Sequence, residues 1–242
     1  MSPPLPKNIN PCPIIDANIE IRFSTDVEPD AVFGLIYREV RGDYADIEKL
    51  PILQIPEKIR NEDPNFQYKA THRLKNDIFT MQIGPRTIAV GAGSGRDYPG
   101  WLVINEEIER RLQNMDKIDL KPVITRVGVR YIDFFEDDIF DNIKLKITAN
   151  GTQVSNEQCL IRLEFVEGEL LQALQIANHV EIQDDSKSRQ GSAVDIDTYI
   201  EADLGQSFSK QSVWIEKGHA LQKERFFGLL TDGFLKSLNP EY

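Results

Sequence analysis

The segment 126–133 constrains the fold most, because it has the pattern of a core strand that carries two arginines on one face. Side chains alternate between the two faces of a β-strand, so Arg126 and Arg130 point the same way. The other face is apolar and carries Val127, Val129 and Tyr131. Guanidinium groups are rarely buried unless they are paired. Either the arginine face meets acidic partners within the fold, or it is part of a binding surface.

A second strand pattern, 193–203, offers acidic partners for these arginines. Its carboxylates recur at alternate positions, with Tyr199 among them: Asp195, Asp197, Glu201 and Asp203. Such a row could hold a divalent cation, but cation sites usually draw their oxygen ligands from several elements. A solvated sheet face or a pairing with the arginines is therefore favoured. We expect at least one of Arg126 and Arg130 to pair with a carboxylate of another strand.

Strand and helix patterns alternate along the chain. Strands are expected at 15–23, 66–75, 78–84, 86–92, 122–133, 143–149, 157–167, 170–183 and 193–203. Helices are expected after a cap at Thr25 or Asp26, at 100–115 and at 210–237. This order predicts an α+β protein with largely antiparallel sheets and helices packed on one side.

The domain organisation follows from the same pattern. Residues 1–13 are Pro-rich and predict an extended N-terminal segment. Residues 14–242 then form a single α+β domain, with 14–118 and 119–242 as a candidate pair of similar β/α halves. The best candidates for mobile loops are 42–65 and 184–192.

Composition argues against several classes of protein. The net charge of −11 opposes binding to nucleic acid, because affinity for DNA or RNA comes mainly from neutralising phosphates. No run of about 18 apolar residues occurs, so no membrane span is expected. The N-terminus has neither the basic nor the apolar region of a signal peptide, which predicts a soluble cytoplasmic protein.

The residue types that usually carry catalysis or bind metals form no familiar pattern. Cys12 and Cys159 are the only cysteines, and we expect them to be inert free thiols. The histidines His72, His179 and His219 have no partner at a zinc-ligand spacing. The sequence therefore assigns no catalytic residue, no metal site and no cofactor.

The glycine-rich segment 91–95 follows a predicted strand and precedes a predicted helix. It lacks the Gly-Lys-Ser/Thr of a phosphate loop, and Arg96 stands where a dinucleotide loop needs a third glycine. We expect a flexible turn rather than an anion site.

The expected C-terminal helix is more apolar than one core-facing stripe requires. A helix packed on one sheet buries a stripe of about 100°. The apolar side chains wrap farther around this helix: Phe226, Phe227, Leu229, Leu230, Phe234 and Leu235. The excess should contact the segment 42–65, the helix 100–115 or a second subunit. The helix is thus expected to be essential to the fold and to form a homodimer or a protein contact.

Three segments together resemble a known family. They are the strand from Pro13 to Phe23, the Arg-x-Gly-Val-Arg-Tyr-Ile strand from Arg126 to Ile132, and the helix pattern of His219, Phe226, Leu230 and Thr231. In this order they resemble a sporadically distributed family of uncharacterised prokaryotic proteins of similar length, whose members have no agreed activity. A patchy distribution implies an association with mobile or defence genes.

The leading hypothesis is a non-enzymatic binding or interaction protein. The alternative is an enzyme, or a sensor of an anionic small ligand, with a cleft lined by Arg126, Arg130, Tyr131 and His219. Arginine suits that role because its planar fork binds carboxylate or phosphate at two points. Guanidinium groups that converge on an open concavity favour the alternative. Guanidinium groups that are already paired with carboxylates favour the leading hypothesis.

Overall fold

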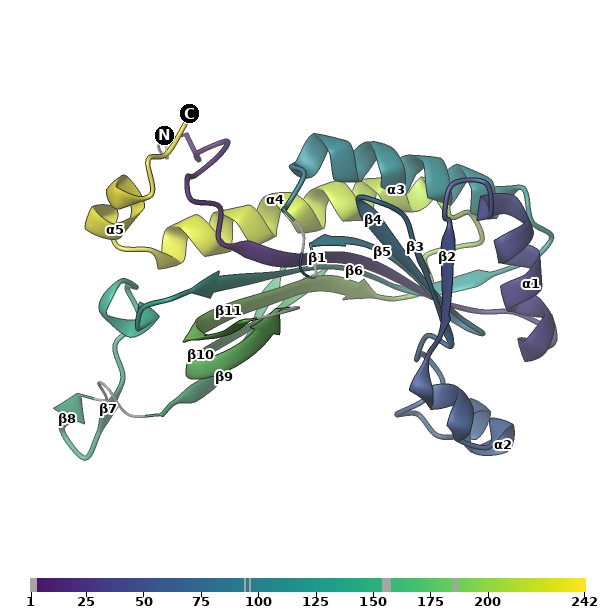
Figure 1. Cartoon of the computed structure of the whole chain (residues 1–242), viewed down its shortest axis with the longest axis horizontal. Coiled ribbons are helices and arrows are strands. Elements are labelled where there is room, and N and C mark those ends of the chain that lie inside the picture. Colours follow the sequence, from purple (N-terminus) through teal and green to yellow (C-terminus); the bar gives the residue numbers. More distant parts are fainter. Residues whose placement is uncertain (1–3, 94, 96, 154–157, 185–186) are drawn as a thin grey trace.

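Nine strands form one antiparallel sheet in the computed structural model, which describes residues 4–93, 95, 97–153, 158–184 and 187–242. Across the sheet they are β2 (Asp46–Lys49), β3 (His72–Lys75), β4 (Phe79–Gly84), β5 (Thr87–Gly93), β1 (Ile14–Ser24), β6 (Val123–Phe135), β11 (Lys187–Glu201), β10 (Leu170–Asp184) and β9 (Leu160–Glu167). A separate pair, β7 (Thr148–Ala149) and β8 (Thr152–Gln153), lies at one end of the molecule (Figure 1). The expected α+β class with antiparallel strands is confirmed.

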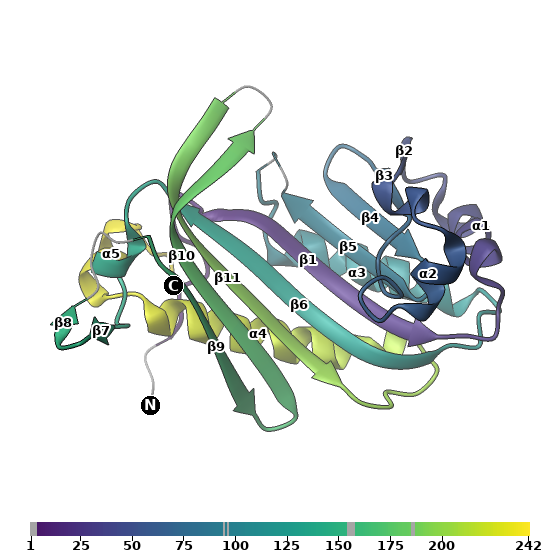
Figure 2. The same ribbon diagram turned by 90° about the horizontal axis from the view of Figure 1, so that it is seen from below.

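Two long helices lie on one face of the sheet. α3 (Trp101–Asp116) and α4 (Ser212–Leu229) run side by side above it (Figure 1), and Asn105 of α3 donates a hydrogen bond to Glu216 of α4 at 2.9 Å. From below, the strands β1, β6, β11, β10 and β9 stand in front of α4 (Figure 2). The shorter helices are α1 (Pro29–Val40), α2 (Glu57–Glu62) and α5 (Asp232–Ser237), with single 3₁₀ turns at Pro51–Gln54, Ile139–Asp141 and Ser209–Gln211.

The pairing of β1 with β6 joins residues from both expected halves in one sheet. Alternate side chains of both strands point toward the helices, as their sequence pattern predicts: Ala17, Ile19, Ile21 and Phe23 from β1, with Val127, Val129 and Tyr131 from β6. The two chain ends also meet, since Asn8 and Glu241 form a β-bridge and the two labels adjoin in Figure 1. Structural similarity between the halves stays a prediction.

Several boundaries differ from the sequence-based prediction. The segment 184–192 is not a loop, because β10 and β11 continue through it as a hairpin, with 185–186 outside the described residues. The segment 42–65 holds β2, α2 and a 3₁₀ turn. The strand expected at 143–149 is reduced to β7 and a bridge from Ile143 to Leu230. Whether these segments form strands depends on backbone pairing with neighbouring strands. The local alternation of apolar residues carries no information about that pairing.

The first helix starts later than its expected cap. α1 begins at Pro29, and Glu28 precedes it without a side-chain cap. Thr25 instead accepts a hydrogen bond from the Val27 amide and donates to the Leu120 carbonyl. Proline suits the first turn of a helix because the missing N–H would have no intrahelical partner there.

The C-terminal helix is broken, and this break explains its apolar excess. α4 ends at Leu229, and α5 begins after Thr231, whose side chain accepts a hydrogen bond from the Phe234 amide. The apolar side chains on both sides of the break join a second hydrophobic cluster that includes Phe135, Ile139, Ile143, Ile176 and Val194. The apolar excess therefore packs on this cluster, while α4 meets the segment 100–115 nearer its N-terminus, through Glu216 and His219. A homodimer through this helix stays a prediction.

Replacing Phe226 with alanine should lower the free energy of unfolding by about 3 kcal/mol. Phe226 is 5% exposed and lies between Phe135 and Phe227, at ring-centre distances of 6.5 and 5.2 Å. Its removal leaves a cavity that these rings cannot close. Urea denaturation followed by circular dichroism measures the change. A loss of less than about 1 kcal/mol would contradict the packing described here.

Candidate functional site

Arg126 lies on the sheet face opposite α4 and is paired on three sides. Its Nη1 donates to Glu20 of β1 at 2.7 Å, and its Nη2 donates to Asp197 of β11 at 2.7 Å. Its Nε lies 3.5 Å from a carboxylate oxygen of Glu201, and its guanidinium carbon is 4.5 Å from the ring centre of Tyr199. The side chain is only 8% exposed. The expected pairing with a carboxylate of another strand is confirmed.

Gly128 makes room for this arrangement. A Cβ atom at this position would lie 2.5 Å from Nη1 of Arg126. The glycine between the two arginines therefore lets the Arg126 guanidinium lie against its own strand. The Arg-x-Gly-x-Arg spacing is a packing requirement of the paired face.

Arg130 makes a two-point contact with Asp195, through Nε at 2.7 Å and Nη2 at 2.5 Å, and its side chain is 46% exposed. Burial raises the pKa of Asp197, and Arg126 and Arg130 offset this only in part. Two guanidinium groups thus face four carboxylates, those of Glu20, Asp195, Asp197 and Glu201. Such a surface is saturated with acidic partners and does not favour an added anion.

Tyr131 and His219 lie on the opposite side of the sheet, beneath the helices. The Tyr131 hydroxyl is 3.1 Å from His219 Nδ1 and 3.5 Å from the Tyr98 hydroxyl. The His219 ring stacks on Trp101 at a ring-centre distance of 3.8 Å. Burial lowers the pKa of His219 to about 4, and Lys223 adds to the effect. The imidazole is therefore neutral near pH 7.

The four residues expected around one cleft are consequently divided between two faces. Arg126 and Arg130 project from one face of β6, and Tyr131 projects from the other toward His219 of α4. Period-two alternation separates consecutive side chains of a strand, so Arg130 and Tyr131 cannot point into the same cleft without a bulge between them.

Asp133 of β6 is a notable residue that the sequence analysis missed. Its side chain is 1% exposed, and its Oδ2 has no hydrogen-bond partner among the described residues. Burial raises the pKa of Asp133 to about 8, and Asp195 adds to the rise. The carboxyl group is then mostly protonated at pH 7. The sequence pattern could have indicated this burial, because Asp133 lies two residues after Tyr131 and therefore on the apolar face of the strand.

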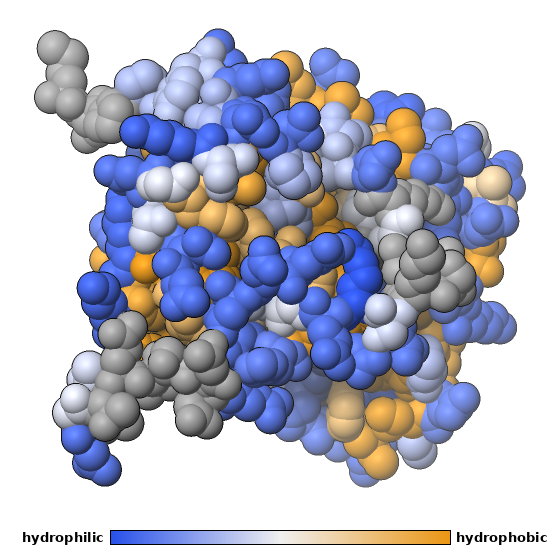
Figure 3. Space-filling view, turned by 60° about the vertical axis from the view of Figure 1, so that its left-hand side comes forward, coloured by the Kyte–Doolittle hydropathy of each residue, from blue (hydrophilic) through white to orange (hydrophobic). Residues whose placement is uncertain are grey.

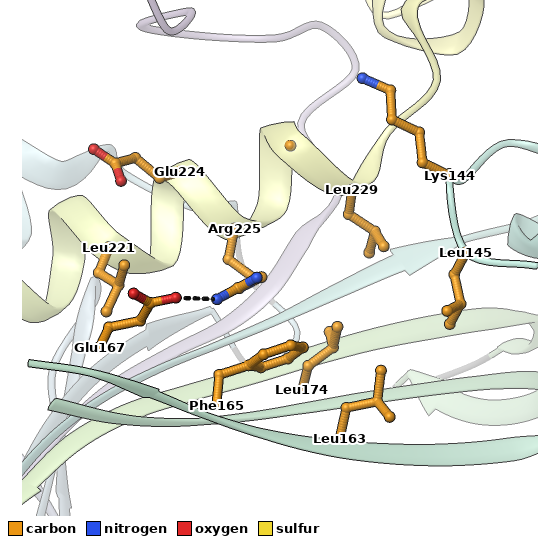
Figure 4. Close-up of a pocket in the computed structure, with 11 residues that line it drawn as sticks. Lys144, Leu145, Leu163, Phe165, Glu167, Leu174, Leu221, Glu224, Arg225 and Leu229 are labelled. Atoms are coloured by element: carbon orange, nitrogen blue, oxygen red, sulfur yellow. Dashed lines mark hydrogen bonds and ion pairs between the residues drawn. The ribbon is translucent and has the colours of Figure 1, made fainter. Parts of the chain in front are cut away.

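A groove of about 450 Å³ lies between α4 and the edge strand β9 (Figure 4). α4 packs on β6 and β11, so the sheet extends beyond the helix and leaves β9 less covered. The apolar lining comprises Leu145, Leu163, Phe165, Leu174, Leu221 and Leu229. In the space-filling view, which brings forward the side that carries α5 in Figure 1, hydrophilic side chains cover most of the surface, with smaller hydrophobic areas between them (Figure 3). The groove was not predicted, because it depends on where α4 crosses the sheet.

Arg225 is held over the floor of this groove. Its Nη2 donates to Glu167 at 3.0 Å, the ion pair drawn in Figure 4, and its Nε donates to Gln172 at 2.5 Å. Gln172, 1% exposed, donates in turn to Thr198 at 2.8 Å. The guanidinium carbon lies 3.9 Å from the ring centre of Phe165. Nη1 of Arg225 makes no hydrogen bond or ion pair within the described part of the chain, so it can donate to a bound partner.

Gly91 and Gly93 lie inside β5 and not in a flexible turn, and a Cβ atom at Gly93 would clash with the Ile15 carbonyl oxygen of β1. Position 94 lies outside the described residues. Cys12 and Cys159 are free thiols. In the described ranges, no three Asp, Glu, His or Cys side chains are grouped so that they could hold a metal ion.

Neither a protein-family model nor a curated protein matches the chain. None of the helices in the described residues is long and apolar enough to cross a membrane. The function must therefore be argued from the geometry.

Proposed function

We propose that the protein is a cytoplasmic, non-enzymatic binding module that receives a short apolar segment of a protein partner in the groove between α4 and β9. The groove itself carries the proposal. It combines an apolar floor with a few charged side chains, those of Lys144, Glu167, Glu224 and Arg225, which is the usual composition of a binding site. The open Nη1 of Arg225 adds a preference for an acidic side chain or a carboxylate in the bound segment.

The saturated arginine face supports a binding role over anion sensing. The guanidinium groups of Arg126 and Arg130 are already paired with carboxylates, and an anionic ligand would have to displace these carboxylates. It would also meet the uncompensated charge of the remaining carboxylates. Tyr131 and His219 add nothing to that surface, because they lie beneath the helices.

Filling the groove tests the proposal. Gly228 lines it, is exposed on α4, and has no atom within 4 Å of an added Cβ. Gly228→Trp should therefore fold normally, because the position lies in the last turn of α4 and is open to a side chain. We expect this variant to lose the partner, as measured by capture from the native host followed by mass spectrometry and direct titration of the purified partner.

Gly34→Trp is the matched control. Gly34 is exposed on α1, is equally open to a side chain, and is not among the residues that line the groove. A partner retained by the wild-type protein and by Gly34→Trp, but lost by Gly228→Trp, supports the groove as the binding site. Identical partners and affinities for all three proteins would contradict it.

A further inference from the structure

We propose that β9 pairs edge to edge with β9 of a second copy of this chain, around a two-fold axis at Leu163. Among the residues that the structure describes, β9 is the last strand of the sheet and pairs with β10 alone. Its sequence, Leu-Ile-Arg-Leu-Glu-Phe-Val-Glu, contains no proline, and its pairing with β10 contains no bulge. An open edge of this length without such protection is a template for another strand.

The hydrogen-bonding direction of β9 limits the ways in which two copies can pair. A two-residue turn, Gly168-Glu169, closes the β9–β10 hairpin at the facing pair Glu167 and Leu170. The residues that flank such a turn exchange backbone hydrogen bonds. Odd-numbered residues of β9 therefore direct their backbone groups toward β10, and even-numbered residues direct theirs outward. Antiparallel pairing with a second β9 must join even-numbered residues to even-numbered residues.

Side-chain complementarity then selects one register. With the axis at Leu163, Arg162 of each copy faces Glu164 of the other. Leu160 faces Val166, and these two side chains are 71% and 72% exposed in the single chain. An axis at residue 162 would set Arg162 against itself, and an axis at residue 164 would set Glu164 against itself. Opposite charges across strands stabilise pairing and like charges oppose it, so only the axis at Leu163 satisfies both kinds of side chain.

The same axis brings the two grooves together. It is perpendicular to the sheet, so both copies of α4 lie on the same face of the joined sheets. Leu163 then faces Leu163 of the other copy, and Phe165 faces Ile161 of the other copy, on the floor between the two helices. The pairing itself does not depend on the proposed partner, because it uses the sheet edge and the face opposite α4.

Charge reversal across the axis tests the pairing. We expect a concentration-dependent monomer–dimer equilibrium for the wild-type chain in sedimentation velocity. Arg162→Glu and Glu164→Arg should each weaken the dimer by about tenfold or more, because each sets like charges opposite each other at two symmetric positions. The double variant Arg162→Glu/Glu164→Arg restores both opposite-charge pairs and should restore the dimer. Arg38→Glu, on the exposed surface of α1, is the control for a change of net charge.

Cross-linking tests the register. In a Cys12→Ser/Cys159→Ser background, Leu163→Cys should form an intermolecular disulfide under mild oxidation, because residue 163 faces itself across the axis at a distance that a disulfide spans. Ile161→Cys faces Phe165 of the other copy and should not. A monomer at every concentration would overturn the proposal. So would a dimer that both single charge reversals leave intact, since it would place the interface elsewhere, as on the C-terminal helix. Neither result would bear on binding of a protein partner in the groove.

Discussion

Asp133→Asn should make the protein more stable than wild type at pH 8, and the difference should shrink toward pH 4. The pKa of Asp133 is about 8 in the folded protein, against 3.8 for an ordinary aspartate. The folded state therefore holds a proton that the unfolded state has released. Stability from this group is fully present below about pH 4 and is lost as the pH rises through about 8. The total loss is about 6 kcal/mol, because the two pKa values differ by about 4 and each pKa unit corresponds to roughly 1.4 kcal/mol.

The measurement is the difference in unfolding free energy between variant and wild type at each pH from 4 to 9. Taking this difference cancels the contribution of His219, whose lowered pKa acts in the opposite direction below its ordinary value. Asp119→Asn, at an exposed position, is the matched control for replacing an aspartate with asparagine. A constant difference between Asp133→Asn and wild type across this range would show that Asp133 is not buried as described.

Arg126→Ala should lower the free energy of unfolding by about 3 kcal/mol, because it leaves the partly buried carboxylates of Glu20 and Asp197 without their cation. Arg126 is the guanidinium that Glu20, Asp197 and Glu201 share. Without it, these groups repel one another on neighbouring strands. Chemical denaturation at pH 7 measures the loss. Protonation relieves the repulsion, so the deficit should become smaller as the pH falls toward 4.

Arg130→Ala is the contrasting variant on the same face of the same strand. Arg130 is 46% exposed and forms its ion pair with Asp195. Exposed ion pairs contribute about 0–1 kcal/mol, so this variant should cost far less than Arg126→Ala. Adding Glu20→Gln to Arg126→Ala removes one of the repelling charges and should recover part of the loss. Equal losses of unfolding free energy for Arg126→Ala and Arg130→Ala would show that Arg126 is not the shared cation of the paired face.

The candidate site was predictable only in part. The alternation of 126–133 and of 193–203 was enough to suggest that arginines meet carboxylates, and the structure places these segments side by side as β6 and β11. Asp133 could have been found, because the same alternation sets it on the apolar face with Tyr131. His219 could not be placed relative to Arg126, since the sequence does not say which face of the sheet α4 covers. The groove beside β9 had no sequence signal at all.

The sequence by itself determined the properties that repeat over a few residues. The period-two pattern of β1 and β6 identifies both strands and both of their faces, because it follows from the geometry of the extended backbone. What only the tertiary structure decided are the properties that depend on distant partners. The break between Leu229 and Asp232, the hairpin through 184–192 and the uncovered edge at β9 all belong to this class. Each depends on which surfaces meet after the chain has folded, and long-range packing overrides local preference at such places.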